Sequence, residues 1–293
     1  MNPGMTPQHC DVLVIGAGAA GLMCALTAGR RGRVVQVIDH ANKPGKKILM
    51  SGGGRCNFTN TGTSAANFIS ANPHFCKSAL ARYTPADFIE IVERHRIAWH
   101  EKELGQLFCD ISSKLIVRML LDECQQAAVR IRTDCAVEGI ERGADGFRVR
   151  TGHGLFHCAS LVIASGGLSI PSMGASGFGY EVARQFGHAV LPTRAGLVPL
   201  TLSGRHQERL ADLSGVALPV EARCNGQAFR NFMLLTHRGV SGPAILQISS
   251  YWQPGDDLRL DLLPGHDPLQ WLRDMKRERG ASELRTVLAE VMP

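Results

Sequence analysis

The residues best suited to chemistry in this sequence are three glycines near the N-terminus, in the pattern Gly16-x-Gly18-x-x-Gly21. In such a turn the first glycine permits a tight bend, the second lets the backbone approach a pyrophosphate, and the third lets a helix pack against the preceding strand. A helix that begins there also presents free N–H groups and the positive end of its dipole to the phosphates. We therefore expect the turn to hold the diphosphate of a dinucleotide on these residues: Gly16, Gly18, Ala19, Ala20 and Gly21.

The segments around this turn have the pattern of a β-strand, an α-helix and a second β-strand. Residues 11–15 are a short apolar, β-branched run, residues 22–31 have helical character, and residues 33–39 are a second strand-like run. Asp39 closes the second run, where a carboxylate accepts hydrogen bonds from a ribose diol and repels a 2′-phosphate. The unit therefore predicts an FAD or NAD site rather than an NADP site, and the motif leaves the choice between FAD and NAD open.

A second glycine-rich loop lies within residues 43–60, where three consecutive glycines stand among lysines, an arginine and asparagines. Such a run is costly in backbone entropy unless the backbone must lie close to a flat or anionic group. A flexible linker is the alternative, but linkers rarely interleave Arg, Cys and Asn in this way. The candidate cofactor contacts in this loop are Lys47, Gly53, Gly54, Arg55, Cys56 and Asn57.

Two further side chains are candidates for redox chemistry or proton transfer. Cys56 is a candidate redox thiol, but no second cysteine lies within a few positions, so a packing or backbone-positioning role is favoured. His237 could deliver a proton, because imidazole titrates near neutral pH. The alternative, to which we give at least equal weight, is a histidine whose side chain is hydrogen-bonded to the backbone of its own loop. The sequence therefore identifies no catalytic residue, and the spacing of its histidines predicts no metal site.

Residues 43–60, together with the N-terminal glycine turn, resemble the BaiN-like (YhiN-type) family of NAD(P)/FAD-dependent oxidoreductases. Three further segments extend the resemblance over essentially the whole chain: Ile163–Pro171, Gly174–Tyr180 and Leu235–Pro243. The resemblance implies that the N-terminal unit holds FAD, with the isoalloxazine near residues 51–57. It also implies an enzyme that transfers hydride through the flavin between a reduced nicotinamide, or another donor, and a small organic substrate.

The same resemblance adds cofactor contacts and an expectation about the end of the chain. It implies that Val137 lies beside the adenine, and that the chain passes close to the nucleotide at Ala164, Ser165 and Gly166. Members of the family continue into a last glycine-rich segment that returns to the flavin, and this sequence ends at Pro293 without one. We therefore expect a chain truncated at its C-terminus. An NAD-dependent dehydrogenase and a catalytically silent flavoprotein remnant remain as alternatives.

The segment pattern and the resemblance together predict an α/β fold: a glutathione-reductase-like Rossmann FAD-binding domain with a β-meander, plus an inserted, β-rich second domain. The first domain is expected at residues 1–190, without its usual C-terminal return segment, and the second, a substrate or cap domain, at residues 191–293. The expected helices are 85–99 and 113–129, and the expected strands of the meander are 129–140, 147–151 and 155–163, with a turn at Asp145-Gly146. The expected strands of the second domain are 197–202, 216–224, 227–235 and 258–263, with a hairpin at Asn225-Gly226.

Composition and charge narrow the class of partner. With 44% hydrophobic and 20% charged residues, the chain has an ordinary globular composition, which excludes collagen-like, disordered and coiled-coil proteins. The net charge is +6, and we interpret the basic residues that produce it as scattered along the sequence. Aromatic residues make up 6% of the chain, which we interpret as too few to form a surface on which nucleic-acid bases stack. A small-molecule substrate and no nucleic-acid partner are therefore expected. Because no second G-x-G-x-x-G motif occurs, any NAD(P)H is expected to visit the substrate cleft as a transient electron donor.

Cysteine usage and the apolar N-terminal stretch bear on the compartment. Nine cysteines are an odd number with no C-x-x-C pair, which favours reduced thiols in a cytoplasm over a disulfide framework or a structural zinc site. Residues 12–29 carry no charge, but they lack a basic leader and are interrupted by glycines. Neither a signal peptide nor a membrane contact is therefore expected, and the oligomeric state is left open.

Overall fold

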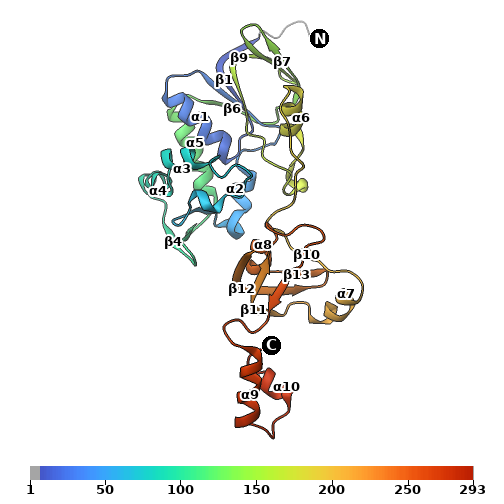
Figure 1. The fold of residues 1–293 in the computed structure, drawn as a ribbon. Helices are drawn as coiled ribbons and strands as arrows, with labels where there is room; N and C mark the ends of the chain where they lie inside the picture. Colours follow the sequence, from blue (N-terminus) through green and yellow to red (C-terminus); the bar gives the residue numbers. More distant parts are fainter. Residues whose placement is uncertain (1–6, 293) are drawn as a thin grey trace. The chain divides into compact units, whose positions relative to one another are not determined.

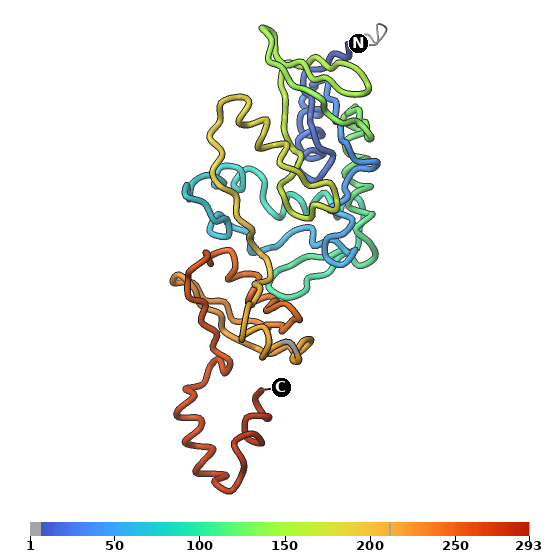
Figure 2. The backbone as a smooth tube through the Cα atoms, turned by 90° about the vertical axis from the view of Figure 1, so that its right-hand side faces the viewer, coloured from blue at the N-terminus to red at the C-terminus, as the bar shows by residue number. Residues whose placement is uncertain are grey.

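The computed structural model describes residues 7–292, which separate into two compact units. Unit 1 extends to Val190 and unit 2 begins at Leu191 (Figures 1 and 2). Within the described residues, no helix combines the length and the apolar character needed to cross a lipid bilayer. Each unit has a sheet and a hydrophobic core of its own.

Unit 1 is built on a six-stranded sheet with the strand order β6-β2-β1-β9-β8-β7. Its strands are β1 (Gln8–Ile15), β2 (Val35–Ile38), β6 (Arg130–Arg132), β7 (Val137–Gly143), β8 (Gly146–Thr151) and β9 (Gly154–Ile163). The strands β6, β2, β1 and β9 run parallel, whereas β9, β8 and β7 form an antiparallel meander. All four residues of β2 are buried, as expected for a strand covered on both faces.

Helices cover this sheet and bury two separate apolar clusters. The helices of unit 1 are α1 (Ala19–Arg30), α2 (Lys46–Met50), α3 (Lys77–Arg82), α4 (Pro85–Arg94), α5 (Lys114–Gln126) and α6 (Phe178–Gln185). One cluster joins α1 and α5 to the sheet through residues such as Leu22 and Leu120, and the other includes Phe156 and Val182. A small second sheet, with the order β3-β5-β4, lies within the same unit: β3 (Asn57–Asn60), β4 (Trp99–Glu101) and β5 (Gln106–Cys109).

Unit 2 is an antiparallel sheet backed by one short helix. The order is β10 (Leu200–Thr201), β13 (Gly239–Ser241), β12 (Gln227–Thr236), β11 (Ala217–Cys224) and β14 (Arg259–Asp261). Burial alternates along β11, so that Val220 and Ala222 pack with Ile245 of α8 (Pro243–Ile248). The remaining helices are α7 (Arg205–Leu210), α9 (Pro268–Glu278) and α10 (Leu284–Leu288).

The predicted fold class is confirmed, and several predicted boundaries are wrong. Both hairpins form, at Asp145-Gly146 and at Asn225-Gly226. The predicted helix 85–99 stops at Arg94, because Arg96 adopts a left-handed conformation (φ +55°) and the chain turns into β4. The predicted strand 129–140 is two strands, since β6 pairs with β2 while β7 joins the meander. The predicted strand 197–202 shrinks to two residues.

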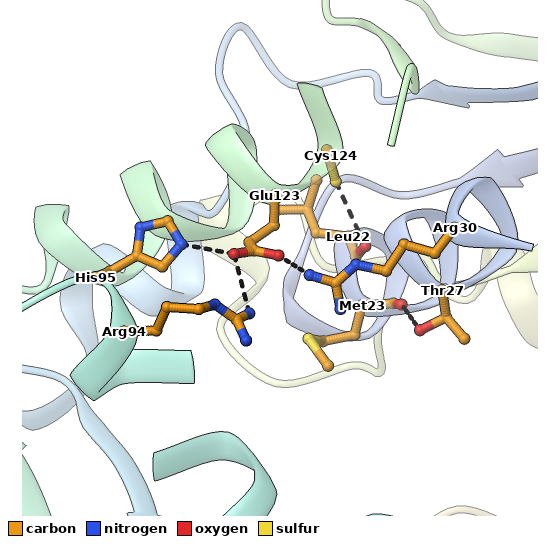
Figure 3. Close-up of polar contacts among 8 residues, drawn as sticks. All are labelled: Leu22, Met23, Thr27, Arg30, Arg94, His95, Glu123 and Cys124. Carbon is orange, nitrogen blue, oxygen red and sulfur yellow. Dashed lines mark hydrogen bonds and ion pairs between the residues drawn. The ribbon is translucent and has the colours of Figure 1, made fainter. Parts of the chain in front are cut away.

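A buried carboxylate joins three helices of unit 1 (Figure 3). The side chain of Glu123 on α5 is only 2% exposed, and it pairs with Arg30 of α1. It also accepts from Arg94 Nη2 at 3.2 Å and lies 2.6 Å from Nε2 of His95, at the end of α4. Because a buried carboxylate is stable only when it is paired, these contacts fix α1, α4 and α5 relative to one another.

Replacing this carboxylate by an amide is expected to loosen unit 1. Glu123→Gln removes the negative charge and leaves three cationic or polar partners without it, at a cost of about 2 kcal/mol, moderated because both arginines are half-exposed. Native-state hydrogen exchange of the α5 amides measures this loss within unit 1 alone. The matched control is Asp122→Asn, which removes only the exposed pair with Arg118 and is expected to cost less than about 0.5 kcal/mol. Equal effects of the two substitutions would contradict the assigned role of Glu123.

Candidate functional site

The turn between β1 and α1 brings backbone segments so close together that two positions admit no side chain. A β-carbon at Gly16, where φ is +115°, would clash with the carbonyl oxygen of Ala164 at the end of β9. A β-carbon at Gly21 would clash with the carbonyl oxygen of Gly16. These contacts hold the start of α1 against the ends of β1 and β9, as the sequence motif predicts.

Gly18 differs from its two neighbours in the motif because its environment is open. It is the N-cap of α1, in an extended conformation (φ −85°, ψ −172°), and no side chain caps the helix there. A β-carbon at this position would meet nothing within 4 Å. The first N–H groups of a helix have no partner within that helix, so the start of α1 offers donors to an anion in the open space.

This open space is a cavity of about 670 Å³ at the carboxyl ends of β1, β2 and β9. Its size lies within the range of roughly 300–1,000 Å³ typical of ligand sites. Of the residues predicted to bind the cofactor, those that line it are Gly16, Gly18, Ala19, Ala20, Asp39, Lys47, Val137, Ala164, Ser165 and Gly166. Segments far apart in the sequence therefore meet where the motif places the dinucleotide. Their contact with a cofactor stays a prediction.

The remaining predicted residues do not line this cavity. They are Gly21, Gly53, Gly54, Arg55, Cys56 and Asn57. Gly21 serves the packing of α1, as described above. The other five continue from α2 through a tight turn in which Gly52, Gly53 and Gly54 all have positive φ (+57°, +64° and +87°), a conformation that favours glycine. The Gly54 carbonyl accepts from Ser113 N at 2.8 Å, which anchors the turn to the start of α5.

Asp39 is held by the backbone of its own unit. One carboxylate oxygen accepts from Ala17 N at 2.7 Å and the other from Ala41 N at 2.8 Å. The side chain lines the cavity and remains 15% exposed. Each carboxylate oxygen accepts a second hydrogen bond readily, so the position suits a ribose diol.

The loop after β9 contributes residues that the sequence analysis did not assign. Residues 173–176 and Phe178 line the cavity, and Gly174 lies so close to the His40 ring that a β-carbon would come within 2.6 Å of Nε2. Lys47 Nζ donates to Ser169 Oγ at 2.9 Å, which ties α2 to this loop. The glycines between Gly174 and Gly179 were the available signal, but their order matches no dinucleotide motif.

A second cysteine lies beside Cys56, although none is near it in the sequence. Cys56 is buried with φ +52°, and Cys109 N on the neighbouring β5 donates to Arg55 O at 2.9 Å. Burial raises the pKa of the Cys56 thiol, and burial together with the nearby Cys56 raises the pKa of Cys109 to about 11. A raised pKa keeps both sulfurs protonated near neutral pH, so the packing role predicted for Cys56 is the one these surroundings favour.

These pKa shifts predict how the two thiols react with an alkylating reagent. Because the thiolate is the nucleophile, iodoacetamide should label Cys56 and Cys109 slowly at pH 8 and faster as the pH rises, with labelling of Cys109 rising as the pH approaches 11. Mass spectrometry of peptides from the native protein measures the labelling, and the denatured protein is the control that labels rapidly. Rapid labelling of native Cys56 at pH 7 would instead indicate a reactive thiol.

The glycine turn allows a paired test of cofactor binding. Gly18→Val should leave the fold intact, because a β-carbon there meets no atom within 4 Å, and should weaken FAD binding by about 100-fold by filling the phosphate position. Gly16→Ala should instead destabilise unit 1, because the added carbon meets the Ala164 backbone. Flavin fluorescence titration and thermal unfolding separate the two effects. Unchanged FAD affinity in Gly18→Val would place the diphosphate elsewhere.

Comparison with known proteins is in agreement with this geometry. Residues 10–245 match the model of the HI0933-like protein Rossmann domain. The chain belongs to the HI0933-like family, and it is a flavoprotein, an FAD-dependent oxidoreductase of the Rossmann type. The resemblance predicted from residues 43–60 is thus confirmed at the level of this family.

Two curated relatives and one solved structure show the range of similar proteins. The ribosomal RNA dihydrouridine synthase of Escherichia coli K12 is 52% identical over 98% of this chain and 72% of its own length. The 3-dehydro-bile acid delta(4,6)-reductase of Clostridium scindens is 29% identical over 86% of this chain and 64% of its own length. The 3-ketosteroid-delta4-(5alpha)-dehydrogenase structure from Rhodococcus jostii RHA1 has a TM-score of 0.43 at 13% identity, over 57% of this chain and 48% of its own. The expected C-terminal truncation stays a prediction.

Proposed function

We propose that this chain reduces uridine in ribosomal RNA to dihydrouridine, with FAD as its resident cofactor. The observation that carries the proposal is the 52% identity to the Escherichia coli enzyme, which extends over 98% of this chain. Sequence identity at this level, over nearly all of this chain and 72% of the relative's own length, supports a shared substrate class as well as a shared fold. The bile acid reductase, at 29% identity, is a more distant guide.

The proposed reaction adds two hydrogens across a carbon–carbon double bond of the uracil ring. FAD, when bound and reduced, supplies the hydride, and a proton completes the product. Both curated relatives carry names that describe a reduction, so this chemistry is common to the proteins that match most of the chain. The chain itself binds, orients and shields the reacting groups.

The residues of the cavity have separate parts in this proposal. The N–H groups at the start of α1, around Gly18, bind the diphosphate, and the carboxylate of Asp39 accepts from the ribose. Lys47 holds the loop that contains Ser169 against the cavity. The backbone around Ala164 supplies the floor beneath the nucleotide.

The electron donor in this proposal is NADH or NADPH, which passes two electrons and a proton to the flavin. The sequence has no second G-x-G-x-x-G motif, which supports a donor that visits the substrate cleft instead of a nicotinamide-binding domain of its own. A ribosomal RNA substrate is in keeping with the cytoplasmic location predicted from the cysteines. A ribosomal RNA substrate departs from the expectation, drawn from composition, that the chain has no nucleic-acid partner. No observation tests that expectation.

The proposal predicts dihydrouridine in RNA treated with the enzyme. Purified protein loaded with FAD, given NADH or NADPH and ribosomal RNA that lacks dihydrouridine, should produce nucleosides heavier by two hydrogens, detected by mass spectrometry after digestion. Gly18→Val protein is the matched control, since it should fold but hold little FAD. Enzyme that oxidises the nicotinamide with a small unsaturated ketone, yet leaves every uridine unreduced, would favour the bile acid type of substrate instead.

A further inference from the structure

The net positive charge of this chain can be assigned to one segment. Between Asp39 and Asp87 the sequence has no acidic residue, but it has six lysines and arginines, as many as the net charge of the whole chain (+6). The rest of the chain is therefore electrically balanced. We call residues 40–86 the acid-free segment. The scattered charge expected from the whole-chain composition does not hold here, because an average over 293 residues hides this asymmetry.

The acid-free segment also exposes aromatic side chains that the core leaves uncovered. Phe75 is 79% exposed and Phe68 is 49% exposed. Phe58 of the same segment shows the contrast, since it packs against Phe88 and Trp99 at ring-centroid distances of 6.1 and 6.3 Å. Rings that are this exposed offer flat apolar faces on which a partner can stack.

The two exposed rings lie on a loop that its own contacts hold closed. The loop connects the short 3₁₀ helix Ala65–Asn67 to α3, and the Cys76 thiol donates to Ala65 O at 3.9 Å across its base. Before the loop, Asn60 Nδ2 donates to Leu104 O at 2.9 Å, which fixes the chain beside β5. Both views place α2, α3 and this loop in the half of unit 1 away from the β7–β8 hairpin (Figures 1 and 2).

Two exposed cations follow these rings in the sequence, on α3. Lys77 and Arg82 of α3 are exposed, and within residues 7–292 neither forms an ion pair. Lys43, Lys46 and Lys47 of the same segment line the cavity itself. The segment thus carries positive charge both at the predicted FAD site and on the exposed loop and helix that follow.

We propose that the acid-free segment is the surface on which single-stranded RNA docks as it delivers a base to the flavin ring expected near residues 51–57; this inference rests on the proposed function. Phosphates bind Lys77 and Arg82, and unpaired bases stack on Phe75 and Phe68. Single-stranded RNA is the occupant that fits, because it combines a negative charge at every nucleotide with flat apolar rings. With the rest of the chain electrically balanced, a polyanion is attracted to this segment above all others.

Binding of a fluorescein-labelled, unstructured RNA oligonucleotide, followed by fluorescence anisotropy, tests the surface. Phe75→Ala should weaken binding about tenfold, because one base no longer has a ring to stack on. Phe75→Leu should weaken it nearly as much, because leucine keeps an apolar side chain but lacks a ring. The double variant Lys77→Ala/Arg82→Ala should lower the slope of log affinity against log salt by about 0.7 for each phosphate that the protein no longer binds.

The matched control is Arg142→Ala/Arg148→Ala, which removes the same charge from exposed positions on the β7–β8 hairpin. It should change RNA affinity by less than about twofold at physiological salt. Equal losses in the two double variants would overturn the proposal, since net charge alone would then explain binding. Three further results would each overturn the proposal. The wild type could fail to bind RNA, or Phe75→Ala could bind RNA as tightly as the wild type. The protein could also self-associate in a way that Phe75→Ala abolishes, which would make the surface an interface between copies of the chain.

Dihydrouridine formation, measured on the same variants loaded with FAD, separates this inference from the proposed function. If the wild type reduces uridine and the surface variants bind RNA as tightly as the wild type, the docking surface is overturned and the proposed function stands. RNA binding that depends on Phe75 and Lys77, without any dihydrouridine, overturns the function and keeps the surface. Because the substituted side chains are exposed, FAD affinity and thermal unfolding should match the wild type in every variant.

Discussion

The contact of the Gly16 and Gly21 backbones with each other and with Ala164 is the constraint on which the site depends. It brings the start of α1 against the ends of two parallel strands, so that the first N–H groups of the helix face a cavity rather than a side chain. Gly18 is the one glycine of the motif whose β-carbon position is open. The space left there is what makes the turn a candidate diphosphate site instead of a tight connection.

The rest of unit 1 keeps this turn in place and supplies the other walls of the cavity. The apolar cluster under α1 and α5, with the buried Glu123 between three helices, makes the frame rigid on one face of the sheet. The walls come from segments of low regularity, the α2 region and the loop after β9, joined through Lys47 and Ser169. A rigid frame with irregular walls is a common arrangement for binding sites, since loops adapt to the ligand while the scaffold positions them.

Local signals in the sequence predicted the parts of the site that lie next to one another along the chain. The β1–α1–β2 unit and both hairpins follow from glycine positions and hydrophobic periodicity. Contacts between distant segments were out of reach: Cys109 beside Cys56, Ser169 beside Lys47, and the pairing of β6 with β2 all depend on tertiary structure. The acid-free segment was within reach, and only the use of whole-chain charge obscured it.

The central claim is that the open turn at Gly18 receives the diphosphate of FAD. A crystal structure of the full chain grown with FAD tests it most directly, because the two phosphates are identifiable in electron density. The account predicts both phosphates within hydrogen-bond distance of the backbone N–H groups at the start of α1, with the ribose on Asp39. Density for FAD in another cavity, with the turn at Gly18 empty, would contradict it.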